Sequence, residues 1–380
     1  MPSHPRPFAT HRADLDALAA DNRRRALIPR AGVDFASNDY LGLAGSDVLR
    51  EALAAGIARG LPAGSGGSRL LRGNHEEHEA VETHAARHYG HEAALFFSTG
   101  FAANAALFAT LPQRGDLIVY DRLIHASAHD GMKLGRAERA AAAHNDPQSF
   151  DDTIAAWRTA GGTGTPWIAV ESLYSMDGDR APLADLAAVA DRHDAILVVD
   201  EAHATGVYGT AGAGLAHGLA RRDNLITLHT CGKALGAEGA LLCGPQIARD
   251  FIVNRGRPFI FSTAPSPLMA WLVRQALEIV ATQPERQAHL QSLVRYAETR
   301  LAALGLPASG TQILPVVIGD NARTMRIAGA LQDAGFDVRG IRPPTVAQGT
   351  ARLRIAITLN VGERDIDAMA DTLAAAMAAA

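Results

Sequence analysis

The residues that could do chemistry lie where apolar runs of the chain end. Asp200 closes the run AILVVD (195–200), His203 follows it, and Lys233 comes three residues after the run LITLHT (225–230). A carboxylate leaving an apolar strand is desolvated, so Asp200 could bind a metal, orient a histidine or pair with a protonated ring nitrogen. A lysine crowded by glycine and apolar neighbours can act as a Schiff-base nucleophile. Taken alone, Asp200 could equally lie in a surface turn, and most lysines are simply solvated.

Other apolar runs are also followed by groups of complementary chemistry. The run AALFFS (93–98) leads to Gly100 and Phe101, where the start of a helix would offer backbone N–H groups to an anion such as phosphate. An ordinary strand-to-helix turn explains that motif alone better. Polar side chains follow two further runs, His125 after 116–120 and Ser175 after 166–172, and Thr230 ends the run that precedes Lys233. Single residues of these types are usually structural, but polar groups at consecutive strand ends indicate one shared site.

Two arginines alternate with apolar residues in the run RLRIAIT. Arg352 and Arg354 fall on one face of a strand by the period of two. An arginine in an apolar strand favours binding of a carboxylate through its planar fork. A surface charge on an edge strand is the alternative, and it suits Arg352 better than Arg354.

The sequence gives little support to other chemistries. Five histidines crowd one segment, but their spacing is not HExxH, and exposed helical histidines are the commoner case. They are His75, His78, His84, His88 and His91. The chain has no GxSxG elbow, no GxGxxG after a strand and no P-loop. Cys231 has no base near it by spacing, so we expect it to be packed in the core.

The elements that must position these residues alternate along the chain. Apolar, β-rich runs are separated by helical patterns such as 150–160 and 182–194, which predicts a mainly parallel sheet with helices on both faces. The strand candidates are 93–98, 116–120, 166–172, 195–200 and 225–230. In such α/β folds, ligands bind at the carboxyl ends of the strands, so these residues are expected to meet there.

Segments before and after this alternation extend the prediction. Helices are expected over 46–59 and 75–89, closed by Gly60 and Gly90, and over much of 265–304. Strands at 313–318, 336–341 and 352–357, with a helix between the first two and one at the C-terminus, predict a smaller α+β domain. The domains expected are an N-terminal segment (1–45), a large domain (46–285) and a small one (286–380).

Composition narrows the functional classes. The 380 residues are 48% hydrophobic and 20% charged with a net charge of −4, which suits a globular chain and gives no global attraction to nucleic acid or an anionic membrane. Two cysteines, Cys231 and Cys243, favour a reducing cytoplasm. The N-terminus lacks the apolar core of a secretory signal, and polar residues within the uncharged stretch 93–113 favour a strand and helix over a membrane span.

Six motifs in order resemble the α-oxoamine synthases, pyridoxal 5'-phosphate enzymes of fold type I with a seven-stranded sheet. They are TGFAAN, DRLIHAS, LYSMDGD, VVDEAHATG, HTCGKALG and GTARLRI, and the resemblance runs from about residue 36 to 367. The stretches 64–82, 257–267 and 340–355 look most like the branch that joins L-alanine to a pimeloyl thioester, on CoA or a carrier protein, in biotin synthesis. Acyltransferases of this family that use glycine or serine are the alternative, and a metal-dependent hydrolase is a remote one.

The resemblance implies a role for each site residue. Lys233 would hold the cofactor and act as the base, Asp200 would pair with the ring nitrogen, and His125 would stack on the ring and contact substrate. Other cofactor positions are Gly100, Phe101 and Thr230 at the phosphate, Thr263 at the phosphate of a neighbouring subunit in a homodimer, and Ser175 and His203 at the phenolic oxygen. Substrate positions are Asn38 and Arg354 for the amino-acid carboxylate and Arg23 and Thr345 for the acyl chain.

The sequence departs from the family on the substrate side. After RLRIAIT the family usually has Ala and, two residues later, His, whereas this chain has Leu359, Asn360 and Val361. Ala347 also replaces a proline common in the subgroup. These changes bear on acyl specificity more than on the chemistry.

Overall fold

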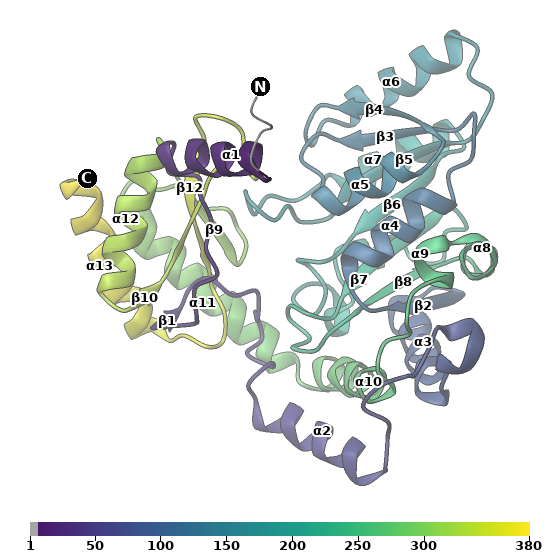
Figure 1. Cartoon of the computed structure of the whole chain (residues 1–380), viewed down its shortest axis with the longest axis horizontal. Helices are drawn as coiled ribbons and strands as arrows, with labels where there is room; N and C mark the ends of the chain where they lie inside the picture. The colour runs from purple at the N-terminus through teal and green to yellow at the C-terminus, as the bar shows by residue number, and fades with distance from the viewer. Residues whose placement is uncertain (1–6) are drawn as a thin grey trace, which may run out of the picture. The chain divides into compact units, whose positions relative to one another are not determined.

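The apolar runs form strands because residues that are apolar on both faces need a sheet covered on both sides. In the computed structural model, which describes residues 7–380, seven strands form one sheet in the order β2-β8-β7-β6-β5-β3-β4 (Figure 1). They are β2 (Ala93–Phe97), β3 (Leu117–Asp121), β4 (Glu138–Ala142), β5 (Pro166–Glu171), β6 (Ile196–Asp200), β7 (Leu225–Thr230) and β8 (Ala240–Gly244). Only β8 runs antiparallel to its neighbours, β2 and β7. The mainly parallel seven-stranded sheet is confirmed.

Two strands of this sheet were not predicted. The sequence of β4, ERAAA, carries two charges and small side chains, and its exposed edge position gives it no apolar signature. The strand β8 has the sequence ALLCG, and all five of its residues are buried, but the sequence analysis assigned no element to these positions. An edge position and small side chains therefore explain why β4 was missed, but they do not explain β8.

Helices cover both faces of the sheet. On one face, α4 (Gly100–Thr110), α5 (Ala126–Leu134), α8 (Gln246–Arg255) and α9 (Arg257–Ile260) pack in one apolar cluster that includes Leu107, Met132 and Phe259. On the other, α6 (Pro147–Thr159) and α7 (Leu183–Arg192) build a second cluster around Phe150 and Leu186. The sheet is thus buried on both faces, as its strands require.

Three further helices pack beside the sheet. They are α2 (Asp47–Ala58), α3 (Glu76–Tyr89) and α10 (Pro267–Thr282), and α10 packs against both others. Ser46 caps α2 by accepting a hydrogen bond from the backbone N–H of Leu49, and Gly90 ends α3 with a φ of 74°. Short helical turns are η1 (Arg69–Gly73), η2 (Thr210–Gly212) and η3 (Ala216–Leu219).

The last quarter of the chain, together with elements near the N-terminus, forms an α+β arrangement, as predicted for the C-terminal part. An antiparallel sheet of order β11-β12-β9 comprises β9 (Ile313–Gly319), β11 (Arg339–Ile341) and β12 (Ala351–Ala356). A second, two-stranded parallel sheet pairs β1 (Val33–Asp34) with β10 (Phe336–Asp337). The single strand predicted over 336–341 is therefore two strands. The helices here are α1 (Ala9–Ala20), α11 (Pro284–Ala302), α12 (Asn321–Asp333) and α13 (Glu363–Ala379).

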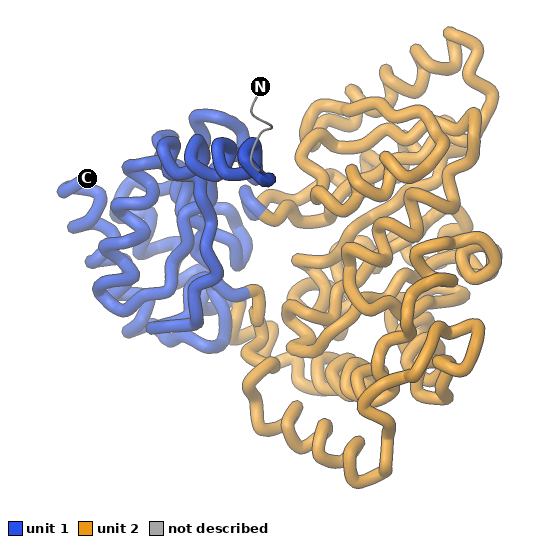
Figure 2. Tube along the Cα trace, viewed as in Figure 1, with its two compact units in different colours: residues 1–37, 176–178, 291–380 blue, residues 38–175, 179–290 orange. Residues whose placement is uncertain are grey.

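The chain divides into two compact units (Figure 2). Unit 1 holds the residues up to Ser37, Met176–Gly178 and Gln291–Ala380, and unit 2 holds Asn38–Ser175 and Asp179–Leu290. The expected domain boundaries at 45 and 285 stay a prediction. Among residues 7–380, no helix is both long enough and apolar enough to cross a membrane.

Candidate active site

Five strands of unit 2 bring predicted site residues to one edge of the sheet. The strands β2, β3, β5, β6 and β7 all point the same way, since β8 is antiparallel to both β2 and β7. Each is followed by residues singled out in the sequence: Gly100 after β2, His125 after β3, Ser175 after β5, His203 after β6 and Lys233 after β7. The carboxyl edge of the sheet is therefore the candidate site.

Asp200 is the buried acid of this edge. Its side chain is 7% exposed, which rules out the surface turn. Oδ1 accepts a hydrogen bond from the backbone N–H of Ala202 at 3.0 Å, and Oδ2 accepts one from Nδ2 of Asn104 at 2.9 Å. Asn104, on α4, was not assigned a role from the sequence. Two donors hold this carboxylate in one orientation at the end of β6.

A hydrogen-bonded chain connects Asp200 to His125. Nδ2 of Asn104 also donates to Oγ of Ser127 at 2.9 Å, and Ser127 Oγ lies 2.8 Å from Nδ1 of His125. The backbone N–H of Ser127 also donates to that Nδ1, so the nitrogen is an acceptor and a neutral His125 ring carries its proton on Nε2. Asn104 and Ser127 are buried, and sequence patterns gave no sign of this connection.

The electrostatics place His125, Asp200 and Lys233 within reach of one another's charge. Solvent reaches part of the His125 side chain, yet desolvation by the surrounding protein lowers its pKa. The Asp200 carboxylate opposes this shift in pKa, and the Lys233 ammonium reinforces it. The three residues singled out for catalysis thus form one electrostatic cluster.

Glu171 is a second buried acid that the sequence analysis missed. It ends β5 directly beside Asp200 in the strand register and is 2% exposed. Desolvation and the Asp200 charge raise the pKa of Glu171 well above its ordinary value, opposed by hydrogen bonds from the backbone of Ser175 and His125. A carboxyl at the end of the run PWIAVE was the available signal, because Asp200 ends its own run in the same way.

Tyr40 connects His203 to Asn38 by hydrogen bonds. The hydroxyl of Tyr40 lies 2.6 Å from Nδ1 of His203 and donates to Oδ1 of Asn38 at 3.0 Å. Tyr40 is fully buried and His203 is 5% exposed. Because the hydroxyl has one proton and gives it to Asn38, the hydrogen bond to His203 requires a proton on Nδ1. One predicted cofactor residue and one predicted substrate residue are therefore linked.

The start of α4 and the end of β7 lie against each other. Thr99 caps α4 by accepting a hydrogen bond from the N–H of Ala102, and the first N–H groups of any helix lack partners within it. A Cβ at Gly100 would lie 2.7 Å from Cγ2 of Thr230, so only glycine allows this approach. Phe101 is 51% exposed at the same helix start.

Lys233 is half-buried in a tight loop between β7 and β8. The backbone N–H of Gly236 bonds to the Lys233 carbonyl oxygen at 2.9 Å, and the N–H of Ala237 bonds to that of Cys231 at 3.0 Å. Gly236 has a φ of 64°, a left-handed conformation that favours glycine. Cys231 and Cys243 are buried free thiols, as expected for packed residues.

Thr263 lies in the exposed turn between α9 and α10. Its neighbour Ala264 donates its N–H to the carbonyl oxygen of Gly67 and accepts a hydrogen bond from Ser65 Oγ. These contacts tie the turn to residues 65–67 of the same unit.

Both arginines of β12 belong to unit 1. Each is 6% exposed, and β12 is the central strand of its sheet. The expectation of an edge-strand surface charge at Arg352 is therefore wrong: Arg352 forms an ion pair with Asp177 and donates to the carbonyl oxygen of Met176. The strand order, which sequence periodicity does not contain, buries it.

The two predicted acyl-binding residues lie in neighbouring segments of unit 1. Nε of Arg23 donates to the carbonyl oxygen of Pro343 at 3.1 Å, and Nη2 of Arg25 donates to Oγ1 of Thr345 at 2.8 Å. Residues about 320 positions apart are thus brought together. Among the departures from the family, Asn360 donates to Asp34 at 3.3 Å and Val361 is buried, so both serve the packing of this unit.

The histidine-rich segment makes local contacts. His75 caps α3, His78 bonds to the carbonyl oxygen of Pro265, His84 stacks on His88, and His91 bonds to Thr227. Within residues 7–380, no three His, Cys, Asp or Glu side chains are grouped so as to hold a metal ion.

The groups of unit 2 fit pyridoxal phosphate. The fit rests on the close Gly100–Thr230 approach at a helix N-terminus, which suits a phosphate, and on a buried carboxylate and a half-buried lysine within reach of each other's charge. Asp200 offers an anion to a protonated ring nitrogen, and Lys233 offers an amine to an aldehyde. His125, beside both, presents a flat ring.

Comparisons with known proteins agree with a pyridoxal phosphate site. Residues 30–373 match the family model for aminotransferase class I and II. The chain is 42% identical to the 8-amino-7-oxononanoate synthase of Anaeromyxobacter dehalogenans, over 96% of this chain and 94% of that one. The structure of the 8-amino-7-oxononanoate synthase from Francisella tularensis matches with a TM-score of 0.76 and 26% identity, covering 90% of this chain and 97% of that one.

A serine palmitoyltransferase variant from S. paucimobilis with a bound PLP–myriocin aldimine matches with a TM-score of 0.89 and 25% identity, covering 98% of both chains. The fold, the ordered motifs and the extent of these matches all agree. The chain belongs to the aminotransferase class I and II family and, within it, to the α-oxoamine synthases.

Proposed function

We propose that this enzyme condenses L-alanine with a pimeloyl thioester, releasing carbon dioxide and the thiol, as an 8-amino-7-oxononanoate synthase of biotin synthesis. The observation that carries the choice of reaction is the 42% identity to such a synthase along nearly the whole chain. Pyridoxal phosphate is the cofactor. The two buried free thiols suit the reducing cytoplasm as the site of the reaction.

The site residues divide the chemistry among them. When bound, the cofactor supplies an electron sink for the carbon next to the substrate nitrogen. Asp200, held by Asn104 and Ala202, keeps a proton on the ring nitrogen. Lys233 would hold the cofactor through its amine and would serve as the base that takes the α-proton of alanine. His125 would stack on the ring, while Ser175 and His203 would lie at its phenolic oxygen.

Phosphate and substrate are bound by separate groups. The N–H groups of Gly100 and Phe101 and the hydroxyl of Thr230 hold the phosphate. Asn38 and Arg354 would bind the alanine carboxylate and fix its orientation. Arg23 and Thr345 bind the acyl chain, which arrives on CoA or on a carrier protein.

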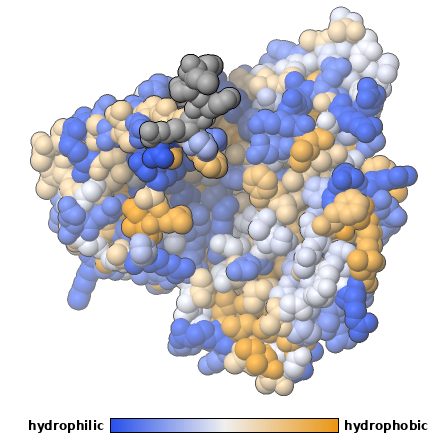
Figure 3. Space-filling model, in the orientation of Figure 1, coloured by the Kyte–Doolittle hydropathy of each residue, from blue (hydrophilic) through white to orange (hydrophobic). Residues whose placement is uncertain are grey.

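We further propose that the enzyme is a homodimer. The helix α9 packs against both η1 and α4, and this region exposes large apolar side chains. They are Leu70 at 51%, Leu71 at 84%, Phe101 at 51% and Phe261 at 70%. More hydrophobic residues gather at the surface of unit 2 near α2 (Figure 3). Thr263, two residues after Phe261, would reach the phosphate of the partner subunit.

The chain offers an unusually sharp test, because it contains only two lysines, Lys133 and Lys233. The purified protein should develop a visible absorbance band with pyridoxal phosphate, and borohydride reduction followed by peptide mapping should find the cofactor on Lys233. Lys233→Ala should lose the band and the activity. Lys133→Ala is the matched control, since Lys133 is exposed on α5 and pairs with Asp130.

The substrates are tested separately. L-alanine, glycine and L-serine are added in turn, each with pimeloyl-CoA or the pimeloyl carrier protein, and product and carbon dioxide are measured. We expect turnover with L-alanine. A preference for glycine or L-serine would reassign the enzyme to another branch of the family.

A further inference from the structure

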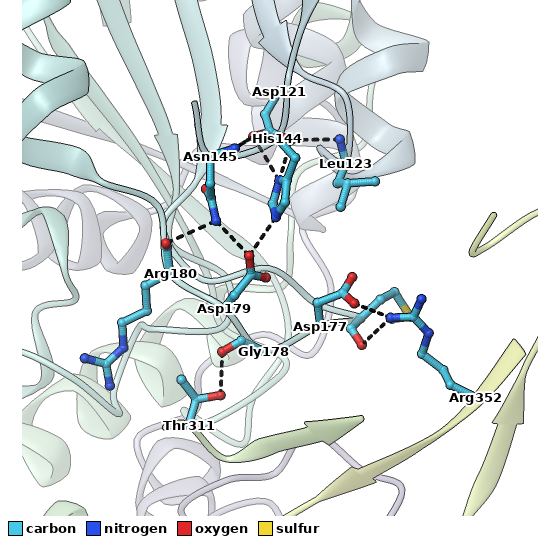
Figure 4. A network of polar contacts seen from close by, with 11 residues as sticks. Asp121, Leu123, His144, Asn145, Asp177, Gly178, Asp179, Arg180, Thr311 and Arg352 are labelled. Atoms are coloured by element: carbon cyan, nitrogen blue, oxygen red, sulfur yellow. Dashed lines mark hydrogen bonds and ion pairs between the residues drawn. The ribbon is translucent and has the colours of Figure 1, made fainter. Parts of the chain in front are cut away.

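His144 is held between two carboxylates in unit 2, in the loop between β4 and α6. Its Nδ1 lies 2.9 and 3.0 Å from the two oxygens of Asp121, and its Nε2 lies 2.6 Å from Oδ2 of Asp179 (Figure 4). The His144 side chain is 15% exposed and that of Asp121 is 0% exposed. The function proposed above gives this residue no role.

The geometry requires a charged ring. A neutral imidazole has one N–H, so one of its nitrogens would present a lone pair to a carboxylate oxygen. Burial opposes the charge of His144, but the hydrogen bonds to Asp121 and Asp179 outweigh it and raise the pKa to about 9. The other titratable group against the ring is Tyr174, whose ring packs edge-on at 4.5 Å between centroids.

Asp121 shapes the loop that leads to His125. As the last residue of β3, it accepts hydrogen bonds from the backbone N–H groups of Leu123 at 2.8 Å and Asn145 at 2.9 Å. Its carbonyl oxygen accepts from the N–H of Ile124. The next residue, His125, caps α5. The position of Asp121 therefore sets the path of the chain into His125.

Asp179 shapes the loop that carries Ser175. Its carbonyl oxygen accepts a hydrogen bond from the N–H of Tyr174 at 2.9 Å, which closes the turn around Ser175. Its carboxylate also accepts from Nδ2 of Asn145 at 2.7 Å. The buried carboxylate of Glu171 joins the same two loops from inside, through the backbone of Ser175 and His125.

We propose that His144 is a positioning residue for the cofactor: its imidazolium, bridging Asp121 and Asp179, fixes the loop of His125 relative to the loop of Ser175. This role rests on the proposed function, in which these two residues contact the cofactor ring. It acts through the two loops and involves no contact of His144 with the cofactor.

The bridge gives cofactor binding a defined pH dependence. The pKa of His144 in the folded protein is raised above its ordinary value of 6.5. The stabilisation that the charged His144 bridge gives to the two loops is therefore complete below about pH 6.5, and it is lost as the pH rises through about 9. We expect the affinity for pyridoxal phosphate to contain a component that falls over this upper range.

The test compares His144→Gln with a matched control. His193→Gln removes a histidine of the same burial, 14% exposed, whose Nε2 lies 2.6 Å from Asp151 on α6, outside both loops. Pyridoxal phosphate affinity is measured by absorbance titration between about pH 6 and pH 10. We expect His144→Gln to weaken binding by about tenfold or more at neutral pH and to flatten the pH dependence above 7. His193→Gln should stay within about twofold of the wild type.

Each outcome decides a different point. Affinity of His144→Gln within about twofold of the wild type, with the pH dependence intact, overturns the role and leaves the proposed function standing. A wild-type protein that does not bind pyridoxal phosphate overturns the proposed function and this role with it. If His144→Gln does not fold, Asp179→Ala decides, because it removes the acceptor on one side of the bridge at a 39% exposed residue, and unchanged affinity there rejects the role.

Discussion

Tyr40 illustrates how one buried hydroxyl can serve two site residues. Removing it as Tyr40→Phe takes one hydrogen-bond partner from Nδ1 of the buried His203 and one from Oδ1 of the half-buried Asn38. We expect the free energy of unfolding to fall by about 0.5–1.5 kcal/mol for each of these hydrogen bonds, the usual net contribution of one such bond. The KM for L-alanine should rise severalfold, because Asn38 loses the contact that orients its amide.

The control for this prediction is Tyr296→Phe. The hydroxyl of Tyr296 also makes hydrogen bonds, to Asp367 at 2.9 Å, but it lies in unit 1 on α11. Urea unfolding and alanine kinetics are measured for both variants. If Tyr40→Phe behaves like Tyr296→Phe in the KM for L-alanine, the link between His203 and Asn38 has no role in substrate binding.

The sequence analysis identified the candidate site residues at the strand ends, but it did not identify the residues that form hydrogen bonds with them. Asp200, His203 and Lys233 could be found because each follows an apolar run. Asn104 could not be connected to Asp200, because 96 positions separate them and no local pattern encodes the contact. Roles taken from the family resemblance remain predictions until variants are measured.

At the scale of elements, the close approach of α4 to β7 depends on the absence of a Cβ at Gly100. In Gly100→Ala the new Cβ would lie 2.7 Å from Cγ2 of Thr230, so the helix start or the strand end must shift. We expect pyridoxal phosphate to bind about tenfold more weakly, because the proposed phosphate donors lie on these two elements. Affinity is measured by absorbance titration.

A second substitution distinguishes steric crowding by the Thr230 methyl group from a loss of the Thr230 hydroxyl. Thr230→Ser removes the obstructing methyl but keeps the hydroxyl, so the double variant Gly100→Ala with Thr230→Ser should recover most of the affinity. Gly329→Ala on α12, where a Cβ meets nothing within 4 Å, is the control for replacing a glycine in a helix. A double variant no better than Gly100→Ala alone would show that crowding against Thr230 is not the cause.

Prediction of elements succeeded where side chains are large and failed where they are small. The strands β6 and β7 were found because their apolar runs have no other explanation. The Ala-rich β4 was missed for want of that pattern. Arg352 was misplaced for a different reason, since its burial depends on β11 and β9 flanking β12, and strand order is set by the fold as a whole.

At the scale of the whole molecule, the net charge of −4 does not disfavour the handling of anions, because cations and helix termini are concentrated locally. Unit 2 places Lys233 and the start of α4 at the carboxyl edge of its sheet. Unit 1 contains Arg354, and its segments at Arg23 and Thr345 are joined by hydrogen bonds. The residues predicted to bind the cofactor thus lie in unit 2, and Arg23, Thr345 and Arg354, which are predicted to bind substrate, lie in unit 1.

The last prediction concerns assembly. Phe261→Asp puts a charge on the exposed apolar region formed by η1, α9 and the start of α4, and a charge buried in an interface without a partner is strongly unfavourable. We expect this variant to shift toward monomer in sedimentation and to bind pyridoxal phosphate more weakly, because each phosphate would lose the partner's Thr263. Val317→Asp, at a 56% exposed residue of β9 in unit 1, should change neither property. A monomeric Phe261→Asp variant with full cofactor affinity would support the proposed homodimer of the wild-type enzyme. It would also show that Thr263 of the partner does not contribute to cofactor binding.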